Sequence, residues 1–176
     1  MLLSNENSTV TVYISSHAGE EFIKIQDADV ITTEDFARAV TEMYTKKRYK
    51  RMAIFLETCR AFTFFKNLNA PNVFVMASSD EGENTMSHTY HPGLSMTIND
   101  VFSFYFINFM DKAYTKFSTL ADLYFYIKKN IESATVRYMN NLGIDMAQVK
   151  LDEFLGVDTK STFNYLNAEE FNKLIM

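Results

Sequence analysis

The chain has 176 residues, of which 47% are hydrophobic and 22% are charged, and this composition is typical of one globular domain with a substantial core. Its formal net charge of -5 gives no electrostatic reason to bind nucleic acid, because that binding depends on basic side chains that neutralise phosphates. The single cysteine, Cys59, excludes a disulfide within the chain. We expect one domain over residues 1–176, with its core at about 9–155 and a C-terminal tail at 156–176.

Targeting signals are not visible in the sequence as it stands. The first residues lack the basic segment and apolar stretch that mark a secretory signal peptide. The longest apolar stretch, residues 101–110, is much shorter than the roughly 20 residues that a membrane-spanning helix needs. The sequence therefore predicts neither a signal peptide nor a transmembrane segment within this chain.

The first half of the chain reads as strand, helix and strand. Residues 9–15 are rich in β-branched and aromatic side chains, which is typical of a strand, and they lead directly to His17. A short apolar segment follows at 22–25, and Thr32 or Thr33 is suited to cap a helix whose apolar residues recur at helical spacing.

Residues 52–56 then form a continuous apolar run, as expected for a strand that is covered on both faces, and Cys59 follows this run. A strand–helix–strand unit places its two strands in parallel, and in many such proteins they are neighbours. We therefore expect His17 and Cys59 to leave adjacent strands at the same edge of one sheet. The carboxyl ends of strands in open α/β sheets are also where ligands bind.

The second half of the chain contains further apolar segments of both kinds. A short helix is expected over 60–67, a buried strand over 73–77 and a hydroxyl-rich loop over 78–91. Beyond them the sequence predicts helices at about 100–111 and 119–129, weaker strands at 135–139 and 148–151, and a short helix from Ala168. This pattern indicates an α/β fold with a mostly parallel sheet.

Cys59 and His17 together supply the groups that thiol catalysis needs. The cysteine would attack a carbonyl carbon, the imidazole would take and return protons, and backbone N–H groups of Ala18, Gly19 and Cys59 would hold the oxyanion. A helix that begins just after Cys59 would favour a thiolate. Taken alone, Cys59 also suits a buried core position and His17 a structural hydrogen bond, so the hypothesis depends on the pair.

Other chemistries have weaker support. His88 and His91 with Cys59 are possible zinc ligands, but a His-x-x-His pair lacks the ligand spacing of structural zinc sites, and we predict no metal and no cofactor. The sequence has no Gly-x-Ser-x-Gly motif, no Walker-type phosphate loop and no Gly-x-Gly-x-x-Gly motif.

Several blocks in fixed order carry a family resemblance. They are residues 12–19, 22–27, 47–49, 57–59 and 77–79, followed by Gly82 and Glu83. This arrangement resembles the family of catalytic subunits of glycosylphosphatidylinositol (GPI) transamidases, which are relatives of legumain among the caspase-like cysteine peptidases. The likeness extends from about Leu3 to Phe154.

The resemblance implies a caspase-like three-layer α/β/α sandwich with a mostly parallel sheet, incomplete at its N-terminus. It implies that Cys59 is the nucleophile and His17 its partner. Thr85 and Ser87 match hydroxyl residues that line the pocket for a small substrate residue, and Asp100 matches an acidic position near that pocket.

The implied reaction is cleavage of a C-terminal GPI-attachment signal at a small residue, followed by transfer of the acyl group to the ethanolamine amine of a GPI lipid. The implied setting is the endoplasmic reticulum, with the other transamidase subunits, the proprotein and the GPI lipid as partners. A legumain-like asparaginyl endopeptidase and a degenerate, non-catalytic scaffold are the alternatives. Both alternatives would keep the fold and would differ from a transamidase in their chemistry.

The sequence departs from the family pattern at three places. The family has Gly-His-Gly-Gly where this chain has Ser16-His17-Ala18-Gly19, and an alanine lacks the freedom of glycine at positive φ. Arg60 stands where the family has glutamine. Family members also carry a leader, two strands and a helix before the strand expected at 9–15, so we expect an N-terminally truncated form.

Overall fold

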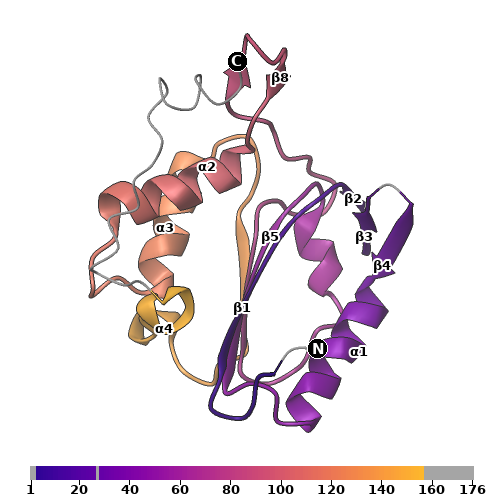
Figure 1. Cartoon of the computed structure of the whole chain (residues 1–176), viewed down its shortest axis with the longest axis vertical. Coiled ribbons are helices and arrows are strands. Elements are labelled where there is room, and N and C mark those ends of the chain that lie inside the picture. The colour runs from indigo at the N-terminus through magenta and orange to yellow at the C-terminus, as the bar shows by residue number, and fades with distance from the viewer. Residues whose placement is uncertain (1–2, 27, 157–176) are drawn as a thin grey trace.

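The computed structural model describes residues 3–26 and 28–156. A four-stranded sheet with the strand order β1-β5-β6-β9 forms the centre (Figure 1). Its strands are β1 (Thr9–Ser15), β5 (Arg51–Glu57), β6 (Val73–Ala77) and β9 (Arg137–Asn140). The first three strands run parallel, whereas β9 is antiparallel to β6.

Helices and smaller sheets surround this centre. The helical segments are α1 (Thr33–Thr45), the 3-10 turn η1 (Ala61–Phe65), α2 (Val101–Asn108), the π-turn η2 (Phe109–Ala113), α3 (Leu120–Asn130), the 3-10 turn η3 (Met146–Gln148) and α4 (Asp152–Leu155). A three-stranded antiparallel sheet contains β2 (Ala18–Gly19), β3 (Phe22–Ile25) and β4 (Asp29–Thr32), and β7 (Tyr90–His91) pairs with β8 (Met96–Thr97).

The central sheet is covered on both faces, because alternate residues of its inner strands point to opposite sides. From β5, Phe55 packs into a core with α2 and α3, whereas Ile54 packs into a second core with α1 and η1. Phe74 and Val75 of β6 divide between the two cores in the same way. The predicted three-layer α/β/α sandwich with a mostly parallel sheet is thus confirmed (Figure 1).

The predicted strands at 9–15, 52–56 and 73–77 are all present, and Thr32 caps α1 by accepting a hydrogen bond from the Asp35 N–H at 3.2 Å. Three other expectations need correction. The segment after Cys59 is a five-residue 3-10 turn rather than an eight-residue helix, and the helix expected at 100–111 ends in the π-turn η2. Residues 148–151 form no strand of the sheet; their one bridge joins Lys150 to Thr119.

Two expectations concern the ends of the chain and the membrane. No helix within residues 3–26 and 28–156 combines the length and the apolar character required to cross a bilayer. The short helix expected from Ala168 lies outside the described residues.

Candidate active site

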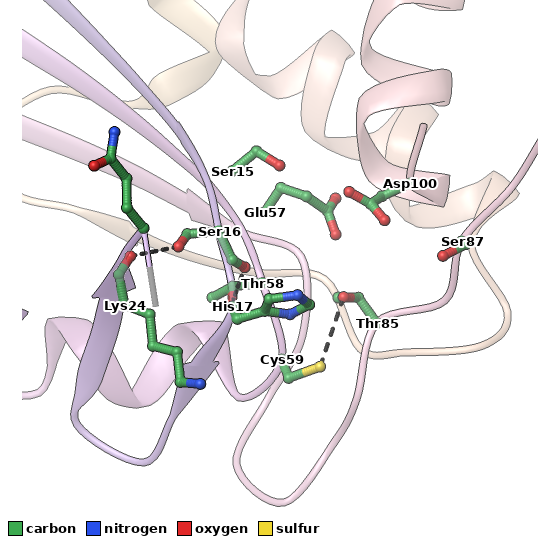
Figure 2. Close-up of a pocket in the computed structure, with 11 residues that line it drawn as sticks. Ser15, Ser16, His17, Lys24, Glu57, Thr58, Cys59, Thr85, Ser87 and Asp100 are labelled. Carbon is green, nitrogen blue, oxygen red and sulfur yellow. Dashed lines mark hydrogen bonds between the residues drawn. The ribbon is translucent and has the colours of Figure 1, made fainter. Parts of the chain in front are cut away.

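The register of the sheet brings His17 and Cys59 to one edge. Ser15 is the partner of Glu57 in the parallel pairing of β1 with β5, so the two chain segments leave the sheet side by side. His17 and Cys59 each follow two residues later, and both line one open cavity of about 370 Å³ (Figure 2). The predicted juxtaposition of these two side chains at the carboxyl edge of adjacent strands is present.

The other lining residues come from five parts of the chain. They are Ser15, Ser16, Lys24, Gln26, Glu57, Thr58, Thr85, Ser87 and Asp100. The three residues predicted for the substrate pocket, Thr85, Ser87 and Asp100, are among them, so the structure brings them together with the cysteine and histidine. Ala18 and Gly19 do not line this cavity, although they directly follow His17.

Buried hydroxyl groups hold the turn that carries Cys59. Thr58 accepts at its carbonyl oxygen from the hydroxyls of Ser78 and Ser79, at 3.1 and 2.8 Å, and its N–H donates to the Ser78 hydroxyl at 3.1 Å. Ser79 Oγ also accepts from the Ala61 N–H at 3.0 Å. Because all these groups are buried, each bond satisfies a polar group that would otherwise be costly.

Arg60 makes the sharp turn that follows Cys59. Its backbone is left-handed, with φ of 56°, and it is held there by a hydrogen bond from its N–H to the Glu83 carbonyl at 2.8 Å. Its guanidinium pairs with Glu20 at 3.1 Å, which joins the cysteine segment to the histidine segment. Both side chains are largely exposed, so the ion pair contributes little stability. Arg60, which stands where the family has glutamine, thus has Glu20 as a local partner.

The segment after His17 forms a tight hairpin with β3. The Lys24 N–H donates to the His17 carbonyl at 2.8 Å, and Ala18 pairs with Ile23 in the register. Ala18 is not among the residues with positive φ, so its backbone is not strained by an alanine. Gly19 is different, because a Cβ there would lie 2.5 Å from Cε1 of Phe22. The aromatic ring therefore favours glycine at 19 and not at 18.

The far wall of the cavity approaches the thiol through a hydroxyl. Thr85 Oγ1 lies 3.9 Å from the Cys59 Sγ, and Ser87 forms an isolated antiparallel bridge with Asp100 (Figure 2). Asp100 occupies the N-cap position of α2 without making a side-chain cap there. Its carboxylate is thus directed to the cavity rather than used to close the helix.

Glu57 is a lining residue that sequence reasoning missed. It is only 1% exposed, and neither carboxylate oxygen has a hydrogen bond of ordinary geometry within the described residues. Loss of solvation and then the negative charge of Asp100 raise the pKa of Glu57 to about 8, although the Thr85 hydroxyl and the first N–H groups of α2 act in the opposite direction. Glu57 is therefore mainly a neutral acid at neutral pH.

The burial of Glu57 was not predicted, because this charged residue follows the apolar run 52–56 and was interpreted as the boundary of the strand rather than as its last buried position. Lys24 and Gln26 were missed for another reason. Their place on the cavity wall depends on the hairpin of β2 with β3, and the two-residue strand β2 has no sequence signal of its own. An i, i+2 spacing of polar residues in the 22–27 segment was the available signal.

The two other histidines do not assemble with Cys59. His88 stacks on Phe104 with 3.7 Å between ring centroids, and its Nδ1 lies 2.9 Å from the Thr89 hydroxyl. His91 belongs to the β7–β8 hairpin. Across the part of the chain that the structure describes, no group of three or more His, Cys, Asp or Glu side chains is placed to hold a metal ion.

A mostly parallel α/β sandwich with a cysteine and a histidine at the carboxyl edge of adjacent strands defines a cysteine-peptidase-like domain. The chain belongs to the Peptidase C13 family, whose model matches residues 1–157. The caspase-like fold expected from the sequence agrees with this family.

Several relatives of known name are similar to the chain. It is 35% identical over 111 residues to the GPI-anchor transamidase of Saccharomyces cerevisiae, covering 63% of this chain and 27% of that protein. It is 34% identical over 111 residues to a putative GPI-anchor transamidase of Drosophila melanogaster, covering 63% of this chain and 31% of that protein. The human GPI-anchor transamidase is 29% identical over 157 residues, covering 88% of this chain and 40% of that protein. The chain thus spans less than half the length of these relatives.

Proposed function

We propose that this chain carries the catalytic centre of a GPI transamidase, in which Cys59 and His17 perform thiol chemistry on a proprotein. The observation that carries the proposal is that these two side chains line one cavity at the ends of adjacent parallel strands. The similarity to GPI-anchor transamidases supports the choice of reaction.

In the first half of the reaction the Cys59 thiolate attacks the carbonyl carbon of the scissile peptide bond. His17 takes the thiol proton and returns it to the departing amine, the carbon–nitrogen bond breaks, and a thioester remains on Cys59. In the second half the ethanolamine amine of the GPI lipid attacks that thioester. Its proton passes to His17, the new amide forms and the thiolate is released.

Two backbone N–H groups are suited to hold the oxyanion. No acceptor within the described residues takes the Cys59 N–H. The Lys24 N–H donates to the His17 carbonyl, so His17 and Lys24 form a hydrogen-bonded pair, and Gly19 and Phe22 form the next such pair along the hairpin. Ala18 lies between these two pairs, so its N–H points away from β3. We therefore assign Ala18 and Cys59 as the donors, and Gly19 as the residue that lets the hairpin close on Phe22.

The wall formed by Thr85, Ser87 and Asp100 is assigned to the substrate residue whose carbonyl is attacked. This assignment is in line with the small attachment-site residues of GPI signals. As partners we propose the other transamidase subunits, the proprotein signal and the GPI lipid, in the endoplasmic reticulum. The similarity to GPI-anchor transamidases supports these assignments.

A peptide-cleavage assay tests this function. The substrate is a peptide with a small residue, a polar spacer and an apolar tail, and hydroxylamine serves as a small nucleophile that traps the thioester as a hydroxamate. We expect hydroxamate formation with the native chain and none with Cys59→Ala or His17→Ala. Cleavage after asparagine in preference to small residues would instead favour a legumain-like endopeptidase, and no cleavage by the chain or its complex would favour a scaffold.

A further inference from the structure

The turn that precedes β1 carries an asparagine in a sequence pattern that the catalytic cavity does not use. Residues 7–9 are Asn-Ser-Thr, which match the Asn-x-Ser/Thr acceptor pattern of N-glycosylation with a residue other than proline in the middle. No other asparagine of the sequence stands in this pattern. A pattern this short also occurs by chance, so the surroundings of Asn7 decide whether it can be used.

The hydrogen bonds of this turn leave the Asn7 side chain unused. The Ser8 N–H donates to the Asn5 carbonyl at 3.0 Å, and the Asn5 N–H donates to the Ser8 hydroxyl at 3.1 Å. Asn7 donates only its backbone N–H, to Asn5 Oδ1 at 2.9 Å. Within the described residues, neither the Asn7 side-chain amide nor the Thr9 hydroxyl makes a hydrogen bond. Because Asn7 is also exposed, its amide nitrogen is accessible from solvent.

The turn lies at the end of the central sheet opposite the cavity. The Lys50 N–H donates to the Ser8 carbonyl at 2.8 Å, which holds the turn beside the start of β5. Each residue of β1 advances the strand by about 3.3 Å, so its seven residues span roughly 20 Å. Asn7 precedes this strand and His17 follows it (Figure 1). A bulky group on Asn7 would therefore extend into solvent without covering the cavity.

We propose that Asn7 is an N-glycosylation site and that Thr9 supplies the hydroxyl that the transferring enzyme recognises. This inference rests on the proposed function for its setting, the lumen of the endoplasmic reticulum. The donor is an oligosaccharide on a lipid diphosphate. The Asn7 Nδ2 forms a bond to the anomeric carbon of the sugar, and the bond from that carbon to the diphosphate oxygen breaks. The diphosphate leaves with the electron pair, and the transferring enzyme takes the amide proton.

Translation in the presence of microsomes from the endoplasmic reticulum tests the proposal. The full chain is translated behind a cleavable secretory leader, and only chains protected from added protease are scored. We expect a mass increase of one glycan that peptide-N-glycosidase removes. The glycosidase converts a glycosylated asparagine to aspartate, so mass spectrometry of the tryptic peptide 1–24 should show aspartate at 7 and asparagine at 5.

Matched variants separate the acceptor pattern from the local structure. Asn7→Gln removes the acceptor and Thr9→Val removes the hydroxyl, so both should lose the glycan. Thr9→Ser keeps a hydroxyl, and Asn5→Gln changes an exposed asparagine of the same turn without changing the pattern, so both should keep the glycan. A protected native chain without a glycan would overturn the proposal, and so would a glycan that persists in Asn7→Gln.

The hydroxamate assay distinguishes a failure of this inference from a failure of the proposed function. Since Asn7 lies outside the cavity, Asn7→Gln should form hydroxamate at the native rate. A glycosylated chain that forms no hydroxamate would count against the proposed function and would still support a glycan at Asn7. A chain that forms hydroxamate but carries no glycan after protected import would overturn this inference alone.

Discussion

The Thr58 hydroxyl donates a hydrogen bond of 2.6 Å to the Ser16 carbonyl, and it thereby joins the residue before Cys59 to the residue before His17. The bond continues the pairing of β1 with β5 beyond the last residues of the strands. The Thr58 carbonyl is in turn held by Ser78 and Ser79. The spacing of the two side chains assigned to catalysis therefore depends on a small network of buried hydroxyls.

Thr58→Val should uncouple the two segments. The change keeps the shape of the side chain but removes the donor to the half-buried Ser16 carbonyl, and the net loss for one hydrogen bond of this kind is about 0.5–1.5 kcal/mol. We expect that loss in the free energy of unfolding and a fall of about 10-fold or more in kcat/KM for peptide cleavage, because small misplacements of catalytic groups are costly. Thr58→Ser keeps the hydroxyl and should retain most of both; similar losses in the two variants would refute this role.

Glu57 should make stability depend on pH. Burial raises the pKa of Glu57 to about 8 in the folded chain from about 4.5 in the unfolded chain, so the folded state holds the extra proton between these values. Stability should then fall as the pH rises from about 4.5 to 8, by at most about 5 kcal/mol. Glu57→Gln should flatten this slope and raise the melting temperature at pH 8.

Thermal unfolding from pH 4.5 to 8.5 measures how steeply stability depends on pH in the native chain and in Glu57→Gln. Glu42→Gln on the exposed face of α1 is the control, since Glu42 is exposed and pairs with its helix neighbour Lys46. If stability depends on pH as steeply in Glu57→Gln as in the native chain, another group holds the proton.

The left-handed backbone of Arg60 predicts a difference between glycine and alanine at this position. A left-handed conformation costs an ordinary residue roughly 1–2 kcal/mol, and glycine adopts it freely. Both Arg60→Gly and Arg60→Ala lose the ion pair with Glu20, so the comparison isolates the backbone. We expect Arg60→Gly to unfold with a free energy about 1 kcal/mol higher than Arg60→Ala in urea titrations. An alanine variant that is as stable as the glycine variant would contradict the turn described.

Gly19→Ala should disturb the hairpin through Phe22. The added Cβ would lie 2.5 Å from the ring, so the ring must move, and overpacking of this kind costs about 1–3 kcal/mol. Because the hairpin also fixes Ala18 and His17, we expect peptide cleavage to fall as well. Phe22→Leu should partly rescue Gly19→Ala in a double-mutant cycle of unfolding free energies, and strictly additive effects would show that the ring is not the cause.

The central strands could be predicted from the sequence because continuous apolar runs such as 52–56 and 73–77 suit strands buried on both faces. The connection between β1 and β5 then placed His17 beside Cys59 without further information. These two steps depend only on hydrophobic pattern and on the topology of strand–helix–strand units. They predicted the edge of the sheet at which the cavity lies.

The surroundings of that pair could not be predicted in the same way. The helix expected after Cys59 is reduced to a short turn because Arg60 turns sharply and Ser79 takes the N–H of Ala61, which are tertiary contacts. Glu57 is a buried acid and so runs against its usual preference for solvent, which no local pattern indicates. Lys24 reaches the cavity only through the pairing of β2 with β3.

If His17 acts on the Cys59 thiol, the rate at which that thiol is alkylated should depend on His17. Cys59 is the only cysteine in the chain, so iodoacetamide incorporation measured by mass spectrometry across pH reports on this one group. We expect fast alkylation of the native chain near neutral pH, marked slowing in His17→Ala, and a native rate in His88→Ala. Slow alkylation that is the same with and without His17 would contradict it.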